Sequence, residues 1–394
     1  MFESFSHLRT RQVPIFLVLA ALTAFVAHAK GRPPSQDILP PVSAVPDGSA
    51  RIEVAFVLDT TGSMSGLLEG AKAKIWSIAN QLATGQPKPD VRIGLVGYRD
   101  RGDAYVTRRV DLTGDIDAVY AELFALRAEG GGDTPESVNQ ALHEAVTDLD
   151  WSTDPGVYRV LFLVGDAPPH TDYQDDVAYS ESVHLARARG IVVNTVQCGA
   201  LATTTPVWRE IAGAGAGQFA AIAQDGAMVT LSAPMDDELA SLNRALAKTV
   251  LAWGAQEEKE EIRQKVRRSL AAAPGVAASR LSYLDKTGGR VNSGRRDLLD
   301  ALEGGLVALD EVSPEELPSE MSEMDASARE AYVVEQQERR RELQREISVL
   351  SRDRDAWVRA ETERLAGAGG ADGFDQKVLE AIRTQAAEKG IAYE

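Results

Sequence analysis

Cysteine is almost absent from this sequence, with Cys198 as its single example in 394 residues. One thiol excludes an internal disulfide, so stability must come from a packed core and from any bound ions. Cys198 ends the apolar stretch IVVNTVQC, and we expect it to be a buried strand residue. Histidine is also scarce, with five in the chain and no His-Glu-x-x-His pattern. A catalytic zinc site of that kind is therefore excluded.

Positive charge is in deficit. The chain has 42 Lys and Arg against 59 Asp and Glu, a formal net charge of −17. An acidic surface repels phosphate backbones, so nucleic acid is not an expected partner. The hydrophobic share of 44% is ordinary for a globular protein, and the length suits two or three domains.

Long apolar runs are missing except near the start. Val13 to Ala27 is apolar, follows Arg9 and Arg11, and leads into Ala27-His28-Ala29. This pattern predicts a signal peptide over residues 1–29, cleaved after Ala29, and hence a secreted or periplasmic protein. The alternative is an uncleaved membrane anchor, although the run is short for a span. Residues 30–50 hold five prolines and predict a linker.

Between residues 51 and 252, short apolar runs alternate with segments of helical periodicity. This alternation predicts a Rossmann-like, doubly wound α/β domain with a mostly parallel sheet. Four residues join the second and third runs, which therefore predict one antiparallel strand at an edge. Strands are expected at 51–59, 91–100, 105–113, 158–166, 191–199 and 218–223. Helices are expected at 66–83, 115–128, 134–149, 177–190, 205–215 and 236–252.

The remainder of the chain is more charged and predicts helices. Residues 253–324 read as a helical and loop region, and residues 325–394 as a long charged helix followed by a C-terminal helix. A heptad seam on the long helix is half polar, which is poor for a coiled coil and favours a helix packed along one side. Its apolar members are Val333, Leu343, Ile347, Leu350 and Trp357; its polar members are Gln336, Arg340, Arg354, Glu361 and Arg364. Self-association through this region is an open alternative.

The stretch LDTTGSMSG at residues 58–66 directly follows the first predicted strand. It is not a nucleophile elbow, because Met64 stands where Gly-x-Ser-x-Gly needs its serine. It is not a phosphate loop, because no lysine follows until Lys72. The glycines of GAGAG at 213–217 follow a predicted helix and do not form a dinucleotide fingerprint.

A metal-binding site explains the stretch LDTTGSMSG better than a nucleophile elbow or a phosphate loop does. Asp59, Thr61 and Ser63 alternate after the strand, so one carboxylate and two hydroxyls can converge at the carboxyl edge of the sheet. Thr134, expected to open a helix, and Asp166, expected to end a strand, are placed at the same edge. Oxygen ligands alone predict Mg²⁺, with Ca²⁺ or Mn²⁺ as alternatives.

In this order, these residues make the chain from about 51 to 235 resemble a von Willebrand factor A domain with a metal-ion-dependent adhesion site, of an exported bacterial type. The family pattern is Asp-x-Ser-x-Ser, a distant Thr and a distant Asp. This sequence matches it with Asp59, Thr61, Ser63, Thr134 and Asp166, with Thr61 in place of the first serine. The resemblance implies that an acidic side chain of a protein partner completes the coordination of the ion. The site's rim is expected to include Ser65, Asp100, Asp133 and His170.

The sequence therefore predicts an exported, metal-dependent protein-binding module and not an enzyme. Two alternatives stay open: a metal-dependent hydrolase that uses the same ion, with Asp100 or His170 as base, and an envelope structural protein that oligomerises through its C-terminal helices. Arg101-Gly102-Asp103 spells an adhesion tripeptide, but we interpret it as the turn between two strands.

Overall fold

The structure is a computed structural model that describes residues 50–393, apart from 133, 289, 292–295 and 368–372. The predicted signal peptide and nearly all of the predicted linker lie outside the described residues, and so does Asp133. The described residues pack as one compact unit. No helix among them is both long enough and apolar enough to span a membrane.

A six-stranded sheet with the order β3-β2-β1-β4-β5-β6 forms the centre of the N-terminal half. Its strands are β1 (Arg51–Asp59), β2 (Asp90–Tyr98), β3 (Thr107–Thr113), β4 (Tyr158–Gly165), β5 (Ile191–Cys198) and β6 (Ala216–Ile222). All neighbours pair in parallel except β2 and β3, which are antiparallel at one edge. The predicted doubly wound sheet with one antiparallel edge strand is confirmed. The strand order reverses between β1 and β4, where such sheets bind their ligands.

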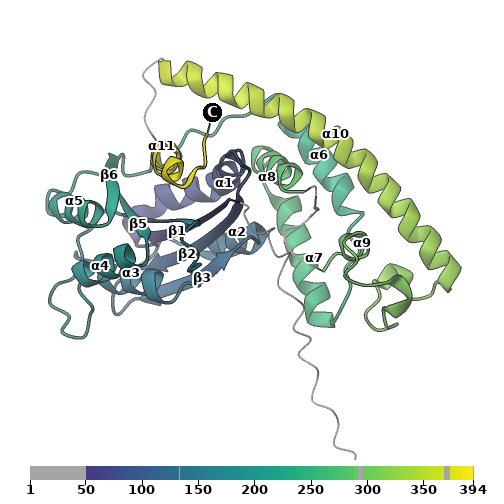
Figure 1. The fold of residues 1–394 in the computed structure, drawn as a ribbon, viewed down its shortest axis with the longest axis horizontal. Helices are drawn as coiled ribbons and strands as arrows, with labels where there is room; N and C mark the ends of the chain where they lie inside the picture. Colours follow the sequence, from purple (N-terminus) through teal and green to yellow (C-terminus); the bar gives the residue numbers. More distant parts are fainter. Residues whose placement is uncertain (1–49, 133, 289, 292–295, 368–372, 394) are drawn as a thin grey trace, which may run out of the picture. The chain divides into compact units, whose positions relative to one another are not determined.

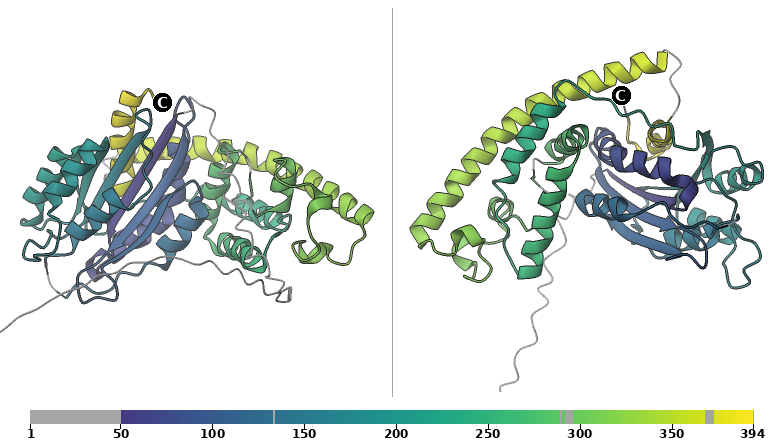
Figure 2. Two further views of the ribbon diagram at one scale, coloured as in Figure 1. Left: turned by 60° about the horizontal axis from the view of Figure 1, so that its bottom comes forward. Right: turned by 180° about the vertical axis from the view of Figure 1, so that it is seen from behind.

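Helices cover both faces of the sheet (Figure 2). One face meets α1 (Ser65–Leu82) and α2 (Ile116–Ala125); the other meets α3 (Val138–Thr147), α4 (Tyr179–Ala188) and α5 (Thr204–Ala214). Alternate residues of β1 divide between the two cores, with Phe56 on the α1 side and Val57 on the α3 side. Cys198 is fully buried at the end of β5, as expected.

The last helix of the chain, α11 (Phe374–Ala386), also packs on the sheet, beside α1 (Figure 1). Its Phe374 ring lies 6.0 Å from the ring of Phe56, and Gln385 accepts a hydrogen bond of 2.7 Å from the Tyr158 hydroxyl. Gln385 also exchanges hydrogen bonds with Asn194 of β5. The sheet is therefore covered in part by a helix that follows it by about 150 residues.

The helical region contains α6 (Asp236–Ala247), α7 (Gln256–Ala271), α8 (Pro274–Lys286), α9 (Leu298–Glu303) and α10 (Ala326–Gly367). The long helix α10 packs against α6, α8 and α9. Three of the polar residues on its predicted seam are buried, namely Gln336, Arg340 and Arg354. Arg340 binds Asp297 and Asp300, and Arg354 binds Asp236, so these two positions serve packing within this chain.

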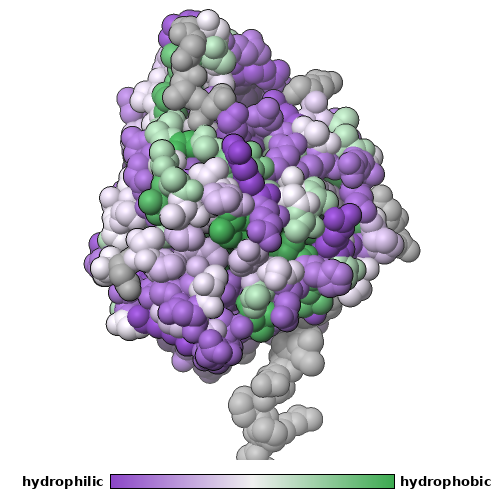
Figure 3. All heavy atoms as spheres, turned by 90° about the vertical axis from the view of Figure 1, so that its left-hand side faces the viewer, coloured by the Kyte–Doolittle hydropathy of each residue, from purple (hydrophilic) through white to green (hydrophobic). Residues whose placement is uncertain are grey.

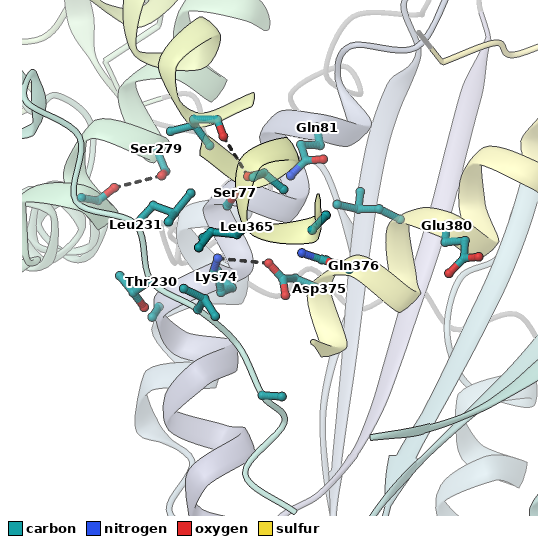
Figure 4. Close-up of a pocket in the computed structure, with 18 of the residues that line it drawn as sticks. Lys74, Ser77, Gln81, Thr230, Leu231, Ser279, Leu365, Asp375, Gln376 and Glu380 are labelled. Carbon is teal, nitrogen blue, oxygen red and sulfur yellow. Dashed lines mark hydrogen bonds and ion pairs between the residues drawn. The ribbon is translucent and has the colours of Figure 1, made fainter. Parts of the chain in front are cut away.

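A cavity of about 560 Å³ lies between α1, α8, α10 and α11 (Figure 4). Lys74 and Asp375 form an ion pair of 3.1 Å in its wall, and Ser77, Gln81 and Leu365 line it. Lys74, Ser77 and Gln81 belong to the middle and end of α1. The start of α1, in contrast, lies at the carboxyl edge of the sheet.

Candidate functional site

The stretch after β1 folds into a tight polar turn. Thr61 donates two hydrogen bonds to Asp59 Oδ1, of 2.8 Å from its backbone N–H and 2.6 Å from its hydroxyl. Ser63 lies on the short 3-10 turn Gly62–Met64 that leads into α1, with its hydroxyl oxygen 3.4 Å from that of Thr61. The structure therefore brings Asp59, Thr61 and Ser63 together as predicted from their spacing.

Asp59 is completely buried, although it is an acid at the end of a strand. Its pKa is raised to about 7: burial and the negative charge of Asp166 raise it, while hydrogen bonds from Thr61 and from the Asp166 backbone lower it. Its second oxygen, Oδ2, is buried with no hydrogen-bond partner among the described residues. A buried carboxylate oxygen of this kind is costly unless a proton or a cation meets it.

Asp166 lies beside Asp59. The residue before it, Gly165, is so close that a β-carbon there would lie 3.1 Å from Asp59 Oδ2. The Gln224 amide, which follows β6, donates to Asp166 Oδ2 at 2.7 Å and to the Ser63 carbonyl at 3.2 Å. Gln224 thereby joins the loops after β1 and β4, and sequence reasoning gave no sign of this role.

Thr134 lies in the loop that precedes α3. We predicted that Thr134 opens this helix, which is wrong: α3 begins at Val138. Residues before it pair instead with the loop after β4, because Glu136 N–H donates to the Pro168 carbonyl and His170 N–H to the Glu136 carbonyl, each at 3.0 Å. The Thr134 side chain is exposed, and no hydrogen bond joins it to the other four predicted ligands among the described residues.

Glu136 is a second buried carboxylate that the sequence analysis missed. It is 3% exposed, and its Oε2 has no hydrogen-bond partner among the described residues. Burial, together with the charges of Asp59, Asp100, Asp103 and Asp166, raises its pKa to about 9. In the sequence, a glutamate after Thr-Pro looks like a favourable residue in the first turn of a helix, so nothing there distinguished it.

No arginine or lysine is paired with Asp59 or Glu136 in the described part of the chain. Three other buried or nearly buried carboxylates also have an oxygen without a hydrogen bond, namely Glu53, Asp176 and Asp300. Arginines neutralise each of them: Arg51, Arg92 and Arg159 act on Glu53, Arg101 on Asp176 and Arg340 on Asp300. Asp59 and Glu136 have no such partner.

Of the four predicted rim residues, two are buried, one is exposed and one lies outside the described residues. Asp100 is buried and accepts hydrogen bonds from the Ser137 hydroxyl at 2.8 Å and from the Tyr173 hydroxyl. His170 is also buried, with Nδ1 2.8 Å from Asp172 and Nε2 3.3 Å from Asp100, and it stacks on Tyr173. Ser65 is exposed at the start of α1. Asp133 lies outside the described residues.

Arg101, Gly102 and Asp103 form the turn between β2 and β3. Arg101 pairs with Asp175 and Asp176, and Asp103 accepts hydrogen bonds from the backbone N–H groups of Asp100 and Gly131. Asp103 therefore holds the glycine loop that leads to Thr134, which is a structural task for this tripeptide.

The donors at the edge fit a small hard cation in their chemistry, because Asp59, Thr61, Ser63 and Asp166 offer oxygen alone. Within the described residues, no group of three His, Cys, Asp or Glu side chains is arranged to hold a metal ion. Hydroxyl oxygens must therefore complete any such site.

The fold and the polar edge together define a doubly wound α/β domain with a ligand site at its switch point. Residues 53–224 match the family model of the von Willebrand factor A domain, and this part of the chain is such a domain. The human von Willebrand factor A domain-containing protein 7 is 30% identical over 163 residues, which are 41% of this chain and 16% of that protein. Its rat counterpart is 31% identical over 165 residues, again 16% of its length. The chain thus spans about a sixth of the length of these two relatives.

Among solved structures, the SpRpn10 VWA domain is similar, with 14% identity, a TM-score of 0.34, and coverage of 45% of this chain and 88% of that one.

Proposed function

We propose that this protein is a metal-dependent protein-binding module in which a divalent cation, Mg²⁺ in first place and Ca²⁺ or Mn²⁺ as alternatives, is held at a metal-ion-dependent adhesion site. Von Willebrand factor A domains generally mediate interactions between proteins. The residues that would hold the ion are Asp59, Thr61, Ser63, Thr134 and Asp166. When bound, the ion would present a positive centre to an acidic group of a protein partner.

One observation carries this proposal: Asp59 Oδ2 is fully buried beside Asp166, with no hydrogen-bond donor and no basic side chain among the described residues. Thr61 fixes the other oxygen of the same carboxylate, so the side chain cannot turn to find a partner elsewhere. A cation would satisfy this oxygen without a change of fold, and it would take the place of the proton that burial favours there.

The surface around the domain supports recognition by polar contacts. On the face drawn in Figure 3, hydrophilic side chains predominate and apolar ones occur in small, separate patches. A partner that docks on this face would gain little from apolar burial.

The experiment is a titration of the full chain with Mg²⁺ after treatment with a chelator, followed by capture of proteins from envelope extracts with Mg²⁺ or with chelator. Asp59→Ala should abolish Mg²⁺ binding and every Mg²⁺-dependent capture while its circular dichroism stays that of the parent. Equal Mg²⁺ binding by the variant and the parent would contradict the proposal.

The hydrolase alternative needs a general base beside the ion. Asp100 and His170, the two candidates for this role, already interact with other side chains. Asp100 accepts hydrogen bonds from Ser137 and Tyr173, and His170 lies between Asp100 and Asp172. We therefore favour binding over hydrolysis. Export by the predicted signal peptide belongs to the same proposal, and N-terminal sequencing of the mature protein should then begin at Lys30.

A further inference from the structure

We propose that the free edge of strand β6 is an interface for a second copy of this chain, in which the two β6 strands pair antiparallel and join the two sheets. The inference concerns a different part of the domain from the metal site and does not depend on a bound ion. It follows from the unpaired backbone of β6, from the absence of charge on this strand and from the hollow beside it.

Strand β6 is the last strand of the sheet and pairs on one side. It lies next to β5 at the end of the order β3-β2-β1-β4-β5-β6 (Figure 1). In the described part of the chain, no strand or isolated bridge lies on its other side. Apart from the pairing with β5, Phe219, Ala220 and Ala221 make no backbone hydrogen bond to a described residue. An edge strand presents its N–H and C=O groups in a row, and another extended strand can pair with such a row.

The composition of β6 does not protect this edge. Its sequence AGQFAAI has no charged residue and no proline, and Ala216, Gln218 and Ala221 are exposed. At the opposite edge, β3 carries Arg108 and Arg109, which pair with acids of α2 and α3. Charged edges resist pairing with another chain, so β6 is the edge of this sheet that is open to it.

A second copy suits this strand because an uncharged strand is complementary to itself. In a two-fold arrangement, residues of one β6 lie opposite residues of the other, and a charged strand can place like charges against each other. Strand β6 has no charge to oppose. The predicted linker at residues 30–50 is a poor alternative partner, since its five prolines have no N–H to donate.

A hollow of about 380 Å³ beside the strand extends the contact. It lies over β5 and β6 next to α11, and its lining includes Gln218, Ala220, Lys377, Glu380 and Ala381. Lys377 and Glu380 form an ion pair of 3.2 Å, and the Glu380 side chain is 67% exposed. Each copy thus offers one charge of each sign on the α11 side of the joined sheet, so opposite charges can meet across the two-fold axis. One strand and one helix from each copy make a small interface, and we expect a reversible dimer.

The test is sedimentation of the full chain in chelator over a range of protein concentrations. The parent should pass from monomer to dimer as the concentration rises. The double variant Gln218→Lys, Ala221→Lys should raise the dissociation constant by more than about tenfold, because like charges then face each other across the strand pair. The double variant Ala356→Lys, Ala360→Lys is the matched control: it adds the same charge at two exposed alanines of α10 and should dimerise as the parent does.

Hydrogen exchange locates the contact. In the parent, the backbone amides of residues 219–221 should exchange more slowly as the dimer forms, whereas those of the β6 lysine variant should not. Melting of each variant checks that it is folded.

Four results would overturn the inference. A monomer at every concentration would leave the edge to a strand of another protein. Exchange in β6 that is slow at every concentration would mean that a segment of the same chain covers the edge. A dimer that the β6 lysine variant keeps, or one that the α10 variant removes, would place the contact elsewhere.

Discussion

At the carboxyl edge of β1 and β4, Asp59 and Glu136 are buried without a basic partner in the described part of the chain. In the helical region, in contrast, Asp236 and Asp297 are equally buried but meet Arg354 and Arg340 at 2.6 and 2.8 Å. Both arrangements remove acids from water. They differ in the group that neutralises the negative charge of the acid. An acid that is paired with an arginine of the same chain holds helices together. An acid without such a partner is available to bind a positively charged group from outside the chain.

Loss of the arginine at one such pair should have the largest effect on stability. Arg340→Met keeps much of the side-chain volume but leaves Asp297 and Asp300 buried without their cation, so we expect a loss of about 3–5 kcal/mol in the free energy of unfolding. Urea unfolding measures it. Mg²⁺ affinity should stay unchanged, because α10 contacts neither β1 nor β4 through this residue.

Arg341→Met is the control for that variant. Arg341 is the next residue on α10, but its ion pair with Glu303 is exposed. Exposed pairs contribute about 0–1 kcal/mol, so this variant should unfold nearly as the parent does. Equal losses in the two variants would show that burial does not distinguish these pairs, and the comparison would fail.

The pH dependence of stability should reveal the acids without a partner. Burial raises the pKa of Asp59 to about 7 and that of Glu136 to about 9 in the folded, metal-free protein. The folded state then holds protons that the unfolded state releases, so this stability is full below the unfolded pKa values and is lost as pH rises through the folded ones.

In chelator, we therefore expect the free energy of unfolding to fall between about pH 5 and pH 9, with a slope of up to about 1.4 kcal/mol per pH unit for each acid that is still protonated in the folded state. Excess Mg²⁺ should remove most of this fall, because the cation takes the place of the proton. Urea midpoints at several pH values, with and without Mg²⁺, measure both. An identical fall in the Asp59→Asn, Glu136→Gln double variant would assign the effect to other groups.

The smallest expected effect concerns the contact between α11 and the sheet. Gln385→Ala removes the hydrogen bonds to Tyr158 and Asn194. We expect a loss of about 1–2 kcal/mol, because the Tyr158 hydroxyl and the Asn194 amide are buried and would lose this acceptor without a replacement. Lys389→Ala, which removes only an exposed contact to the Pro155 carbonyl, should change the urea midpoint little. A midpoint of the Gln385 variant equal to that of the parent would mean that apolar packing alone holds α11.

The sheet was predictable because each buried strand is a short apolar run that ends in a polar residue. The same rule placed Asp59 and Asp166 at one edge, since parallel strands share their carboxyl ends. Whether the five predicted residues bind a metal stays a prediction. The start of α3 was misplaced because Thr134-Pro135 has the composition of a helix start, while the backbone there pairs with the loop after β4.

Other features depend on distance along the chain and could not be predicted locally. Glu136 is buried at this edge because its backbone pairs with the loop after β4. Arg340 and Arg354 weakened the heptad pattern of α10, yet they are buried because Asp297 and Asp236 lie opposite them. The helix α8 lies in the region 253–324 that was predicted as helix and loop, but its bounds were not predicted: its Pro274-Gly275 start resembles a turn, although proline is well suited to the first helical position.

The position of α11 has a consequence for the order of events during synthesis. Strand β1 is translated about 300 residues before Phe374, which covers Phe56. Domains usually fold as they leave the ribosome, beginning with the N-terminal one. Here the apolar residues under α11 wait for that helix to emerge, so the nascent sheet needs protection until α11 has been synthesised.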